Sequence, residues 1–339
     1  MAYSPIATED FVISSEAVVS SLWSNGNTTL TNFYTSSNQE GSSAGNFYLN
    51  VYQTSSDLSI AEVQFAVAYG NKYGYGSAPY NSAVTASSPT KTTYGQYRTL
   101  VNGDENTDFT FGRVGTNNQF TSTEFWVVNI DRSRYKESLL PGGWSLILGT
   151  GSKYLSLTDD SLQNSTIVFK DAGRIYQIVS GSSGTVYTGA NSYGYATSGS
   201  YGWFLPDIGV LLFNPTAISQ SLQLFPNPVT SSAALNNRKF FAAIASGSFF
   251  SARSQETISA DYIFIRARNA EFNYTENPSF TNAVTGEVNY PVFINNPQTY
   301  ITTIGFYNDM GDLLAVAKMS RPLPKDFTKE ALVRVKLDF

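Results

Sequence analysis

The chain has 339 residues and a formal net charge of −5; 42% of its residues are hydrophobic, 14% aromatic and only 14% charged. This length and apolar content allow a large core or two domains, and the many aromatic residues exclude a disordered chain. Cysteine and histidine are absent, which excludes disulfides, thiolate or imidazole metal sites and histidine-based catalytic triads.

The composition favours β structure. Ser, Thr, Asn and Gly are frequent in place of charged residues, and Tyr and Phe are abundant, a mixture that suits strands and polar loops better than helix bundles. The negative charge argues against non-specific nucleic-acid binding. No apolar run approaches the roughly 18 residues that span a bilayer, and the first residues lack the pattern of a signal peptide. We expect neither a nucleic-acid partner nor a membrane partner.

The first segment with regular character, residues 8–24, fits two structures. Ser14 or Ser15 could cap a short helix that ends at Asn25 and Gly26, and a strand through residues 17–23 fits nearly as well. Residues 24–46 are rich in Ser, Asn, Gly and Thr and predict a loop. Residues 47–52 and 61–69 then predict a pair of strands, because apolar and polar side chains alternate along the second run.

Two loops rich in tyrosine and glycine interrupt the predicted strands. They cover residues 70–93 and 193–201, and Trp203 follows the second. Tyrosine gives a large contact area at low entropic cost, and glycine and serine let a loop adapt, as at binding surfaces. The loops could dock a neighbouring subunit, bind a sugar or simply connect strands. The candidate interface residues here are Tyr73, Tyr75, Tyr80, Tyr193, Tyr195, Tyr201 and Trp203.

Further strands are predicted at residues 124–130, 144–148, 166–170, 174–179 and 209–213. The third and fourth of these flank a hairpin turn, and the last reads as a buried strand. The clearest helix covers residues 236–245. Asn236 could cap its start and Gly247 its end, and Phe240, Ala243 and Ile244 share one face. We place a domain boundary at this helix, which gives a β-rich body at 1–235 and a C-terminal β module at 236–339.

The C-terminal module contains four runs with strand character, at residues 262–269, 300–307, 313–319 and 332–339. The Asn, Asp and Gly residues of 308–312 predict a tight turn between the second and third runs. In the last run, Val333, Val335 and Leu337 alternate with charged residues, so we expect these three side chains to be buried. The fold class is therefore mostly β: an antiparallel, sandwich-like body, a smaller C-terminal β module and few short helices.

Three acidic groups are candidate sites of chemistry. Residues 104–108 place oxygen-bearing side chains at alternate positions, as calcium loops do, but they lack the glycine and distant glutamate of an EF-hand and also fit an acidic turn. Asp159 and Asp160 could join a carboxylate pair for glycosidic chemistry, although any β protein with many acids offers such pairs by chance. Asp309 and Asp312 fit a turn. We expect no catalytic, cofactor-binding or metal-binding residue.

Several of these segments carry a resemblance. Residues 272–280, 301–309, 314–322 and the closing strand look like the C-terminal module of virion structural proteins of large contractile-tailed phages (myoviruses), particularly those of marine cyanobacteria. They are also similar to attachment segments of tail-fibre and baseplate-wedge proteins. Residues 94–97 through 109–112, and 129–137 with 140–142, match the same group more loosely. The matching segments cover about half of the chain.

The resemblance implies a structural protein of the virion tail, made in the host cytoplasm, and no enzyme. Its partners would be tail or baseplate subunits and further copies of the chain, and no cofactor is implied. The candidate interface residues of the module are Tyr307, Arg321 and Phe339. The expected location in the virion is the baseplate or the fibre-attachment region. The collar, the neck and the head surface are the alternative locations. A carbohydrate- or receptor-binding tail protein and a polysaccharide-degrading enzyme are the other functional classes.

Overall fold

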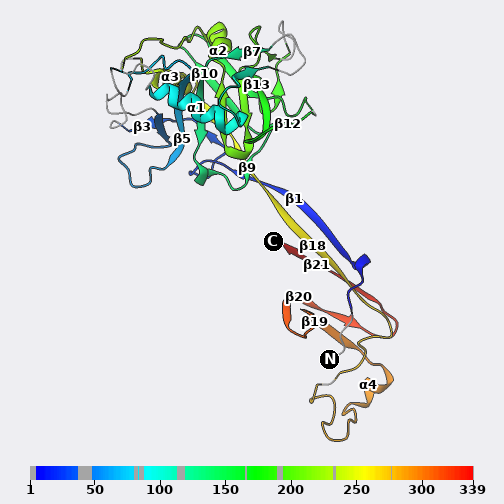
Figure 1. The fold of residues 1–339 in the computed structure, drawn as a ribbon. Helices are drawn as coiled ribbons and strands as arrows, with labels where there is room; N and C mark the ends of the chain where they lie inside the picture. Colours follow the sequence, from blue (N-terminus) through cyan, green and yellow to red (C-terminus); the bar gives the residue numbers. More distant parts are fainter. Residues whose placement is uncertain are drawn as a thin grey trace. The chain divides into compact units, whose positions relative to one another are not determined.

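The computed structural model describes residues 5–36, 48–79, 83, 88–112, 119–164, 166–188, 194–231, 234–275 and 277–338 (Figure 1). The protein is mostly β: of the residues described, 43% lie in strands and 16% in helices. Every strand pair whose register is given is antiparallel. The fold class predicted from composition and alternation, a β-rich antiparallel protein with few helices, is confirmed.

The chain divides into two compact units, which we call the body and the module. The body is Val18–Glu256, and the module combines Met1–Ala17 with Thr257–Phe339. This division differs from the expected boundary between residues 235 and 236. The helix at 236–247 belongs to the body because its apolar face completes the body's core. The first residues belong to the module because β1 (Phe11–Ser21) pairs with β18 (Arg253–Ala267).

One large sheet forms the body. In sheet order its strands are β2 (Thr29–Leu30), β17 (Phe249–Ser251), β10 (Ser145–Gly149), β11 (Tyr154–Asp159), β13 (Gly173–Ser182), β15 (Gly202–Leu205), β16 (Val210–Phe213), β8 (Glu124–Ile130), β5 (Val63–Asn71), β4 (Tyr48–Tyr52) and β3 (Tyr34–Thr35). Phe65 on β5 and Phe250 on β17 lie with ring centroids 5.5 Å apart, although six strands separate β5 from β17 in the sheet. The expected sandwich-like body is therefore a single sheet that curls on itself.

Among its described residues, the body has five further short strands outside this order. They are β12 (Val168–Lys170) and β14 (Thr185–Val186), which pair with β13, β9 (Ser138–Leu139), which pairs with the start of β18, and the separate hairpin of β6 (Phe109–Phe111) and β7 (Phe120–Ser122). The predicted hairpin around residues 171–173 is confirmed by the pairing of β12 with β13, in which Lys170 lies opposite Gly173.

Both faces of the sheet are buried, each in its own hydrophobic core. Along β8, Trp126 and Val128 enter the inner core with Phe65 and Phe250, whereas Phe125 and Val127 enter the outer core. Helices α2 (Pro215–Leu222) and α3 (Asn236–Gly247) pack in the inner core. Helix α1 (Pro89–Asn102) and strand β6 cover the outer face. Two-sided burial explains why β8 and β16 read as unbroken apolar runs rather than alternating ones.

The predicted helix at 236–245 is confirmed as α3, with the expected buried face of Phe240, Ala243 and Ile244. Phe240 stacks on Trp126 with ring centroids 5.0 Å apart. We expected Asn236 to cap the helix, but its side chain does not do so. Its amide instead bonds both backbone groups of Asn227, accepting from N–H at 2.7 Å and donating to C=O at 2.9 Å. This side chain therefore ties the preceding loop to the helix start.

Two helices of the body were not predicted from the sequence. Helix α1 begins inside the segment read as a loop, with Ser88 accepting a hydrogen bond from the Lys91 N–H and Gly103 ending it at φ 71°. Its threonines and its glycine lower helix propensity, and the helix is stabilised by packing of Tyr94, Tyr97 and Val101 in the outer core. Helix α2 is likewise capped by Asn214 before a proline. In residues 8–24 the strand interpretation holds, because β1 follows the 3-10 turn η1 (Thr8–Asp10).

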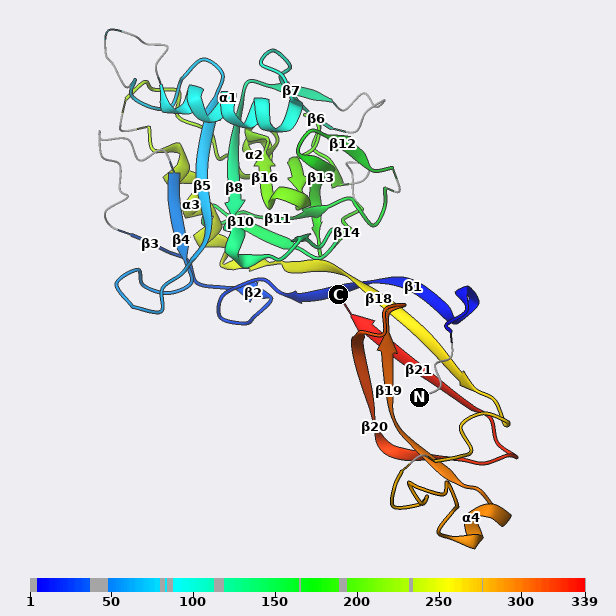
Figure 2. The ribbon, with the colours of Figure 1, turned by 60° about the horizontal axis from the view of Figure 1, so that its bottom comes forward.

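The module contains two thin sheets (Figure 2). One is β1–β18–β21, where β21 is Ala331–Asp338, and the other is the hairpin of β19 (Thr299–Tyr307) and β20 (Leu313–Lys325). The predicted turn is confirmed: the side-chain oxygen of Asn308 accepts from the N–H groups of Met310 and Asp312, and Gly311 has φ 85°. The short helix α4 (Pro291–Asn295) precedes β19.

Burial of the closing strand is less complete than expected. Val335 lies opposite Ile263 of β18 and is 9% exposed, but Val333 and Leu337 are only half-buried. The alternation along β21 is as predicted, since Arg334 and Lys336 lie on the other face over the Tyr262 ring. Burial is shallower than expected because three strands in a single layer leave part of their apolar face uncovered.

Candidate functional site

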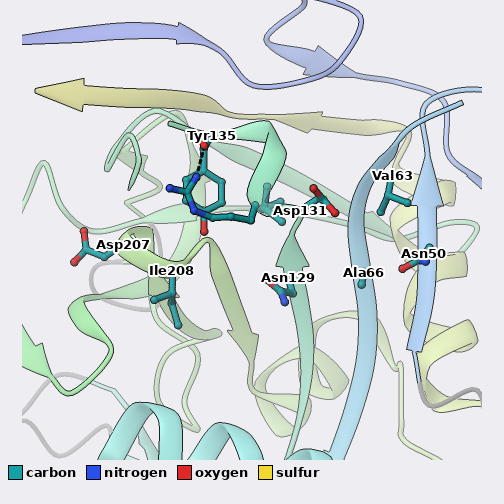
Figure 3. A pocket seen from close by; sticks show the side chains of 10 residues that line it. Asn50, Val63, Ala66, Asn129, Asp131, Tyr135, Asp207 and Ile208 are labelled. Atoms are coloured by element: carbon teal, nitrogen blue, oxygen red, sulfur yellow. Dashed lines mark hydrogen bonds between the residues drawn. The ribbon is translucent and has the colours of Figure 1, made fainter. Parts of the chain in front are cut away.

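An open pocket of about 440 Å³ lies in the body (Figure 3). Strands β4, β5 and β8 form one side of it, and the short 3-10 segments η3 (Arg132–Arg134) and η5 (Pro206–Ile208) form the other. Its lining combines apolar residues such as Val63 and Ile208 with the polar residues Asn129, Asp131 and Arg132. This mixture of a hollow and converging polar groups makes the pocket the first place to look for a bound ligand.

The polar groups of the pocket bond to neighbouring protein groups. The guanidinium of Arg132 donates to the carbonyl of Tyr135 at 2.5 Å and to that of Lys136 at 2.7 Å, and it lies 4.7 Å from the centroid of the Tyr135 ring. Asp207 accepts from the Arg174 Nε at 2.9 Å and from its backbone N–H at 2.7 Å. The Asp207 contacts hold η5 against β13, and the Arg132 contacts close the loop that follows η3, so the network stabilises both loops.

The pKa values of side chains in and beside the pocket are shifted by burial and by the same contacts. Burial raises the pKa of Tyr135, and the nearby Arg132 opposes that shift. Burial also raises the pKa of Tyr97 to about 12, against a hydrogen bond from Asn129. The bond to Asp207 raises the pKa of Arg174. Tyrosines with raised pKa values stay protonated near neutral pH and are poor general bases. Tyr135, which lines the pocket, and Tyr97, which lies beside Asn129, therefore offer no general base near neutral pH.

Asp159 and Asp160 are buried, and each supports a different loop. Asp159 accepts from the N–H of Gly142 at 2.9 Å and from that of Ser161 at 3.0 Å. Asp160 accepts from the N–H of Gln177 at 2.9 Å and from the hydroxyl of Tyr195 at 2.8 Å. Burial raises the pKa of both carboxyl groups. They serve as buried hydrogen-bond acceptors that fix turns around the end of β11.

The proposed calcium-like segment 104–108 is an acidic turn. One oxygen of Asp104 accepts the N–H groups of Asn106 and Thr107, and these bonds, with one from the Thr107 side chain, lower its pKa to about 2. Asp108 forms an ion pair with Lys72 at 2.6 Å. Across the described ranges of the chain, no three acidic side chains gather closely enough to hold a metal ion.

The tyrosine-rich loops contribute less surface than expected. Tyr201 and Trp203 are only 6% and 4% exposed, because Tyr201 packs in the inner core and Trp203 packs against Phe109 and Phe111 in the outer core. Neither can offer its ring to a partner, which corrects the expectation. Tyr195 is half-buried and bonds Asp160.

Tyr73 and Tyr75 are the exposed members of the predicted set in the body. They are 59% and 48% exposed, and their ring centroids lie 6.1 Å apart. Tyr80 and Tyr193 lie outside the described residues, as does Phe339 of the module. Tyr307 is 37% exposed and Arg321 is also exposed. Of the predicted aromatic residues that the structure describes, Tyr73 and Tyr75 are the one pair that lies together on a surface.

The module carries a larger apolar surface that the sequence analysis missed. Among its described residues only five hydrophobic side chains are buried, namely those of Ala260, Ile263, Ala267, Ala331 and Val335. Nineteen large hydrophobic side chains are exposed: Ile6, Phe11, Val12, Ile13, Phe272, Tyr274, Phe280, Val284, Tyr290, Val292, Ile294, Tyr300, Tyr307, Met310, Leu313, Leu314, Val316, Phe327 and Leu332.

The body exposes fewer large hydrophobic side chains for its size than the module does. It has more than twice as many residues as the module, yet it exposes fifteen such side chains. Single exposed apolar residues are normal on any protein, whereas contiguous apolar patches are typical of interaction sites. A signal was present in the sequence: the run Leu313–Val316 is apolar at every position, so a thin hairpin had to expose one of its two faces.

Comparison with known proteins finds no matching family, no matching curated protein and no matching solved structure. None of the helices in the described ranges combines the length and apolar character needed to cross a membrane. The geometry of the chain itself therefore carries the functional argument.

Proposed function

We propose that this chain is a structural component of a tailed-phage virion, placed in the tail baseplate or the fibre-attachment region, and that it acts by assembling with other subunits. The observation that carries the proposal is the exposed apolar surface of the module. The segments that resemble phage attachment modules, residues 272–280, 301–309 and 314–322, lie in this same unit. Surface and resemblance thus point to one part of the chain.

The module lacks a large hydrophobic core of its own among its described residues. Two thin sheets with five buried apolar side chains cannot offset the conformational entropy of ordering about 100 residues, which costs roughly 1–2 kcal/mol per residue. Obligate interfaces between subunits resemble a domain core cut in half. Covering a fully exposed Leu, Val or Phe side chain is worth about 1.5–3 kcal/mol. Neighbouring subunits would supply the missing half of the core.

The body fits the role of a rigid support. Its sheet is buried on both faces, and its buried aspartates and the pocket network are engaged in holding loops. The proposed partners are other tail or baseplate subunits and further copies of the chain. The collar, neck and head surface are alternative stations for the same kind of protein, because assembly through a covered apolar surface is common to all of them.

The test is incorporation into particles of the phage that encodes the chain. We expect mass spectrometry of purified particles to detect the full-length protein, and density maps to place it in the tail. A truncation that removes residues 257–339 should leave particles without the protein or stall assembly. The control Ile60→Asp changes an exposed apolar residue of the body and should be incorporated normally. Absence of the full-length chain from particles would refute the proposal.

A carbohydrate- or receptor-binding role is the second candidate, and the exposed pair Tyr73 and Tyr75 favours it. Adjacent exposed aromatic rings can stack on a sugar or anchor a protein partner. Glycan-array binding that is lost in Tyr73→Ala/Tyr75→Ala would support this role. An array without signal for the intact protein would leave the assembly proposal as the better account.

A further inference from the structure

The hairpin β19–β20 is the most open element of the module. Its strands contain 9 and 13 residues and pair only with each other within the described chain. An isolated two-stranded hairpin is marginally stable in water, and a long edge strand presents unpaired N–H and C=O groups that invite another strand. The hairpin therefore requires a partner both for its backbone edge and for its side chains.

One face of the hairpin carries a strip of exposed apolar residues. The register places Gly305 opposite Val316 and Phe306 opposite Ala315. Phe306 and Ala315 are half-buried on one face, whereas Leu314 and Val316 are 69% and 56% exposed on the other.

The ring of Tyr307 completes this strip. A Cβ built on Gly305 would lie 2.8 Å from the Tyr307 ring, so the ring covers the glycine beside Val316. We call Tyr307, Leu314 and Val316 the hairpin strip. Its apolar character along β20 makes it the part of the hairpin that gains most from being covered.

Charges along the hairpin are segregated. Asp309 and Asp312 lie at the turn, and Lys318 and Arg321 lie toward the other end of β20. None of these four side chains forms an ion pair with another described residue. If a second hairpin lies antiparallel to the first, the acidic turn of each copy faces the basic end of the other. A parallel arrangement would place like charges together, which costs free energy.

From the strip and the charges we propose that the hairpin strip is the contact between two copies of this chain, with β20 against β20, antiparallel about a two-fold axis. A surface that is apolar in the middle and oppositely charged at its ends is complementary to itself, as an isologous interface requires. Pro322 and Pro324 have no N–H group and end the stretch that can pair by its backbone. The inference rests on the assembly role proposed above and names one partner.

The first test is the oligomeric state of the full-length protein by sedimentation equilibrium over a concentration series. We expect the wild type to form dimers. Leu314→Asp/Val316→Asp should raise the dissociation constant about 100-fold or more, because two apolar contacts become charged ones. Both positions are exposed, so circular dichroism and melting of the body should not change. Ile60→Asp, an equally exposed position in the body, should dimerise as the wild type does.

The second test addresses orientation. Asp309→Lys and Arg321→Glu should each weaken the dimer about three- to tenfold, and the double variant D309K/R321E should recover most of the wild-type affinity. Recovery requires that residue 309 of one copy lies near residue 321 of the other. A double variant no tighter than either single variant would overturn the antiparallel arrangement.

A wild type that stays monomeric up to about 100 μM, or dimers unaffected by Leu314→Asp/Val316→Asp, would overturn the proposal. Its failure differs from failure of the proposed function. A monomeric protein found in purified particles would assign the hairpin strip to a different virion subunit. A dimer that is absent from particles would leave the self-contact standing and refute the assembly role in the virion.

Discussion

Asp160 and Asp104 carry the same side chain, but their surroundings shift the pKa of the carboxyl group in opposite directions. Burial raises the pKa of Asp160, whereas side-chain and backbone hydrogen bonds in an exposed turn lower the pKa of Asp104 to about 2. A carboxyl group with a raised folded pKa binds its proton more readily in the folded protein than in the unfolded chain. One with a lowered pKa does the opposite, so the two residues predict opposite dependences of stability on pH.

We expect Asp160→Asn to flatten the loss of stability with rising pH. The contribution of Asp160 is fully present below its unfolded pKa of about 4 and is lost as the pH rises through its higher folded pKa. Urea unfolding at a series of values between about pH 4 and 7 measures this slope. The asparagine side chain can still accept from the Gln177 N–H, so the turn should remain folded.

Asp104→Asn is the matched control with the opposite sign. Its stabilising contribution is present above the unfolded pKa of about 4 and is lost as the pH falls through about 2. The difference between wild type and this variant should therefore be largest near neutral pH and vanish in acid. If both substitutions change the pH dependence in the same direction, the pKa of Asp160 is not raised in the folded protein.

Among the elements, helix α1 depends most on its packing. It lies close to β5: a Cβ on Gly70 would approach the ring of Phe125 to 2.8 Å and the backbone N of Tyr94 to 3.1 Å. Gly95 within the helix has no such neighbour within 4 Å. Gly70 therefore permits the close approach of neighbouring elements, whereas Gly95 makes no such contact and only lowers the helix propensity of α1.

This contrast gives a prediction with a built-in control. Gly95→Ala should raise the free energy of unfolding by about 0.5–1 kcal/mol, because alanine is the better helix former. Gly70→Ala should lower it by about 1–3 kcal/mol, since the added methyl group forces β5 and α1 apart. Denaturant unfolding of both variants measures the two effects. Equal effects of the two substitutions would contradict the close approach of α1 to β5.

At the scale of the whole molecule, the body and the module differ in what stabilises them. The body has two hydrophobic cores on the faces of one sheet, and the module has five buried hydrophobic residues. Single domains commonly unfold in one cooperative step, and both cores of the body share one sheet. The chain should therefore behave as one autonomous domain joined to a segment that needs partners.

We expect a fragment of residues 18–256 to fold alone and to unfold in a single cooperative transition, followed by circular dichroism and intrinsic fluorescence. Residues 257–339 alone should show no such transition at concentrations where they stay monomeric, because too little apolar surface is buried. A fragment 18–256 without a cooperative transition would show that the body depends on the module. The complementary fragment serves as the control for this comparison.

The sequence by itself determined the local structure. Alternation placed the strands later found at β5 and β21, and a short apolar run placed β8. Turn chemistry placed the bend at Asn308, and the spacing of Phe240, Ala243 and Ile244 gave α3 its buried face. These features depend on neighbours within a few residues, which sequence periodicity reports directly. Helix α1 escaped because its stability comes from packing rather than from helix propensity.

Only the tertiary structure decided which side chains are available to a partner. Trp203 and Tyr73 have the same local sequence character, yet the first is buried against β6 and the second is exposed. The pairing of β1 with β18 likewise joins residues more than two hundred positions apart and moves the start of the chain into the module. Burial depends on which distant segments meet, and no local pattern encodes that. The exposed hairpin strip follows from the same cause, because β19 and β20 pair only with each other among the described strands.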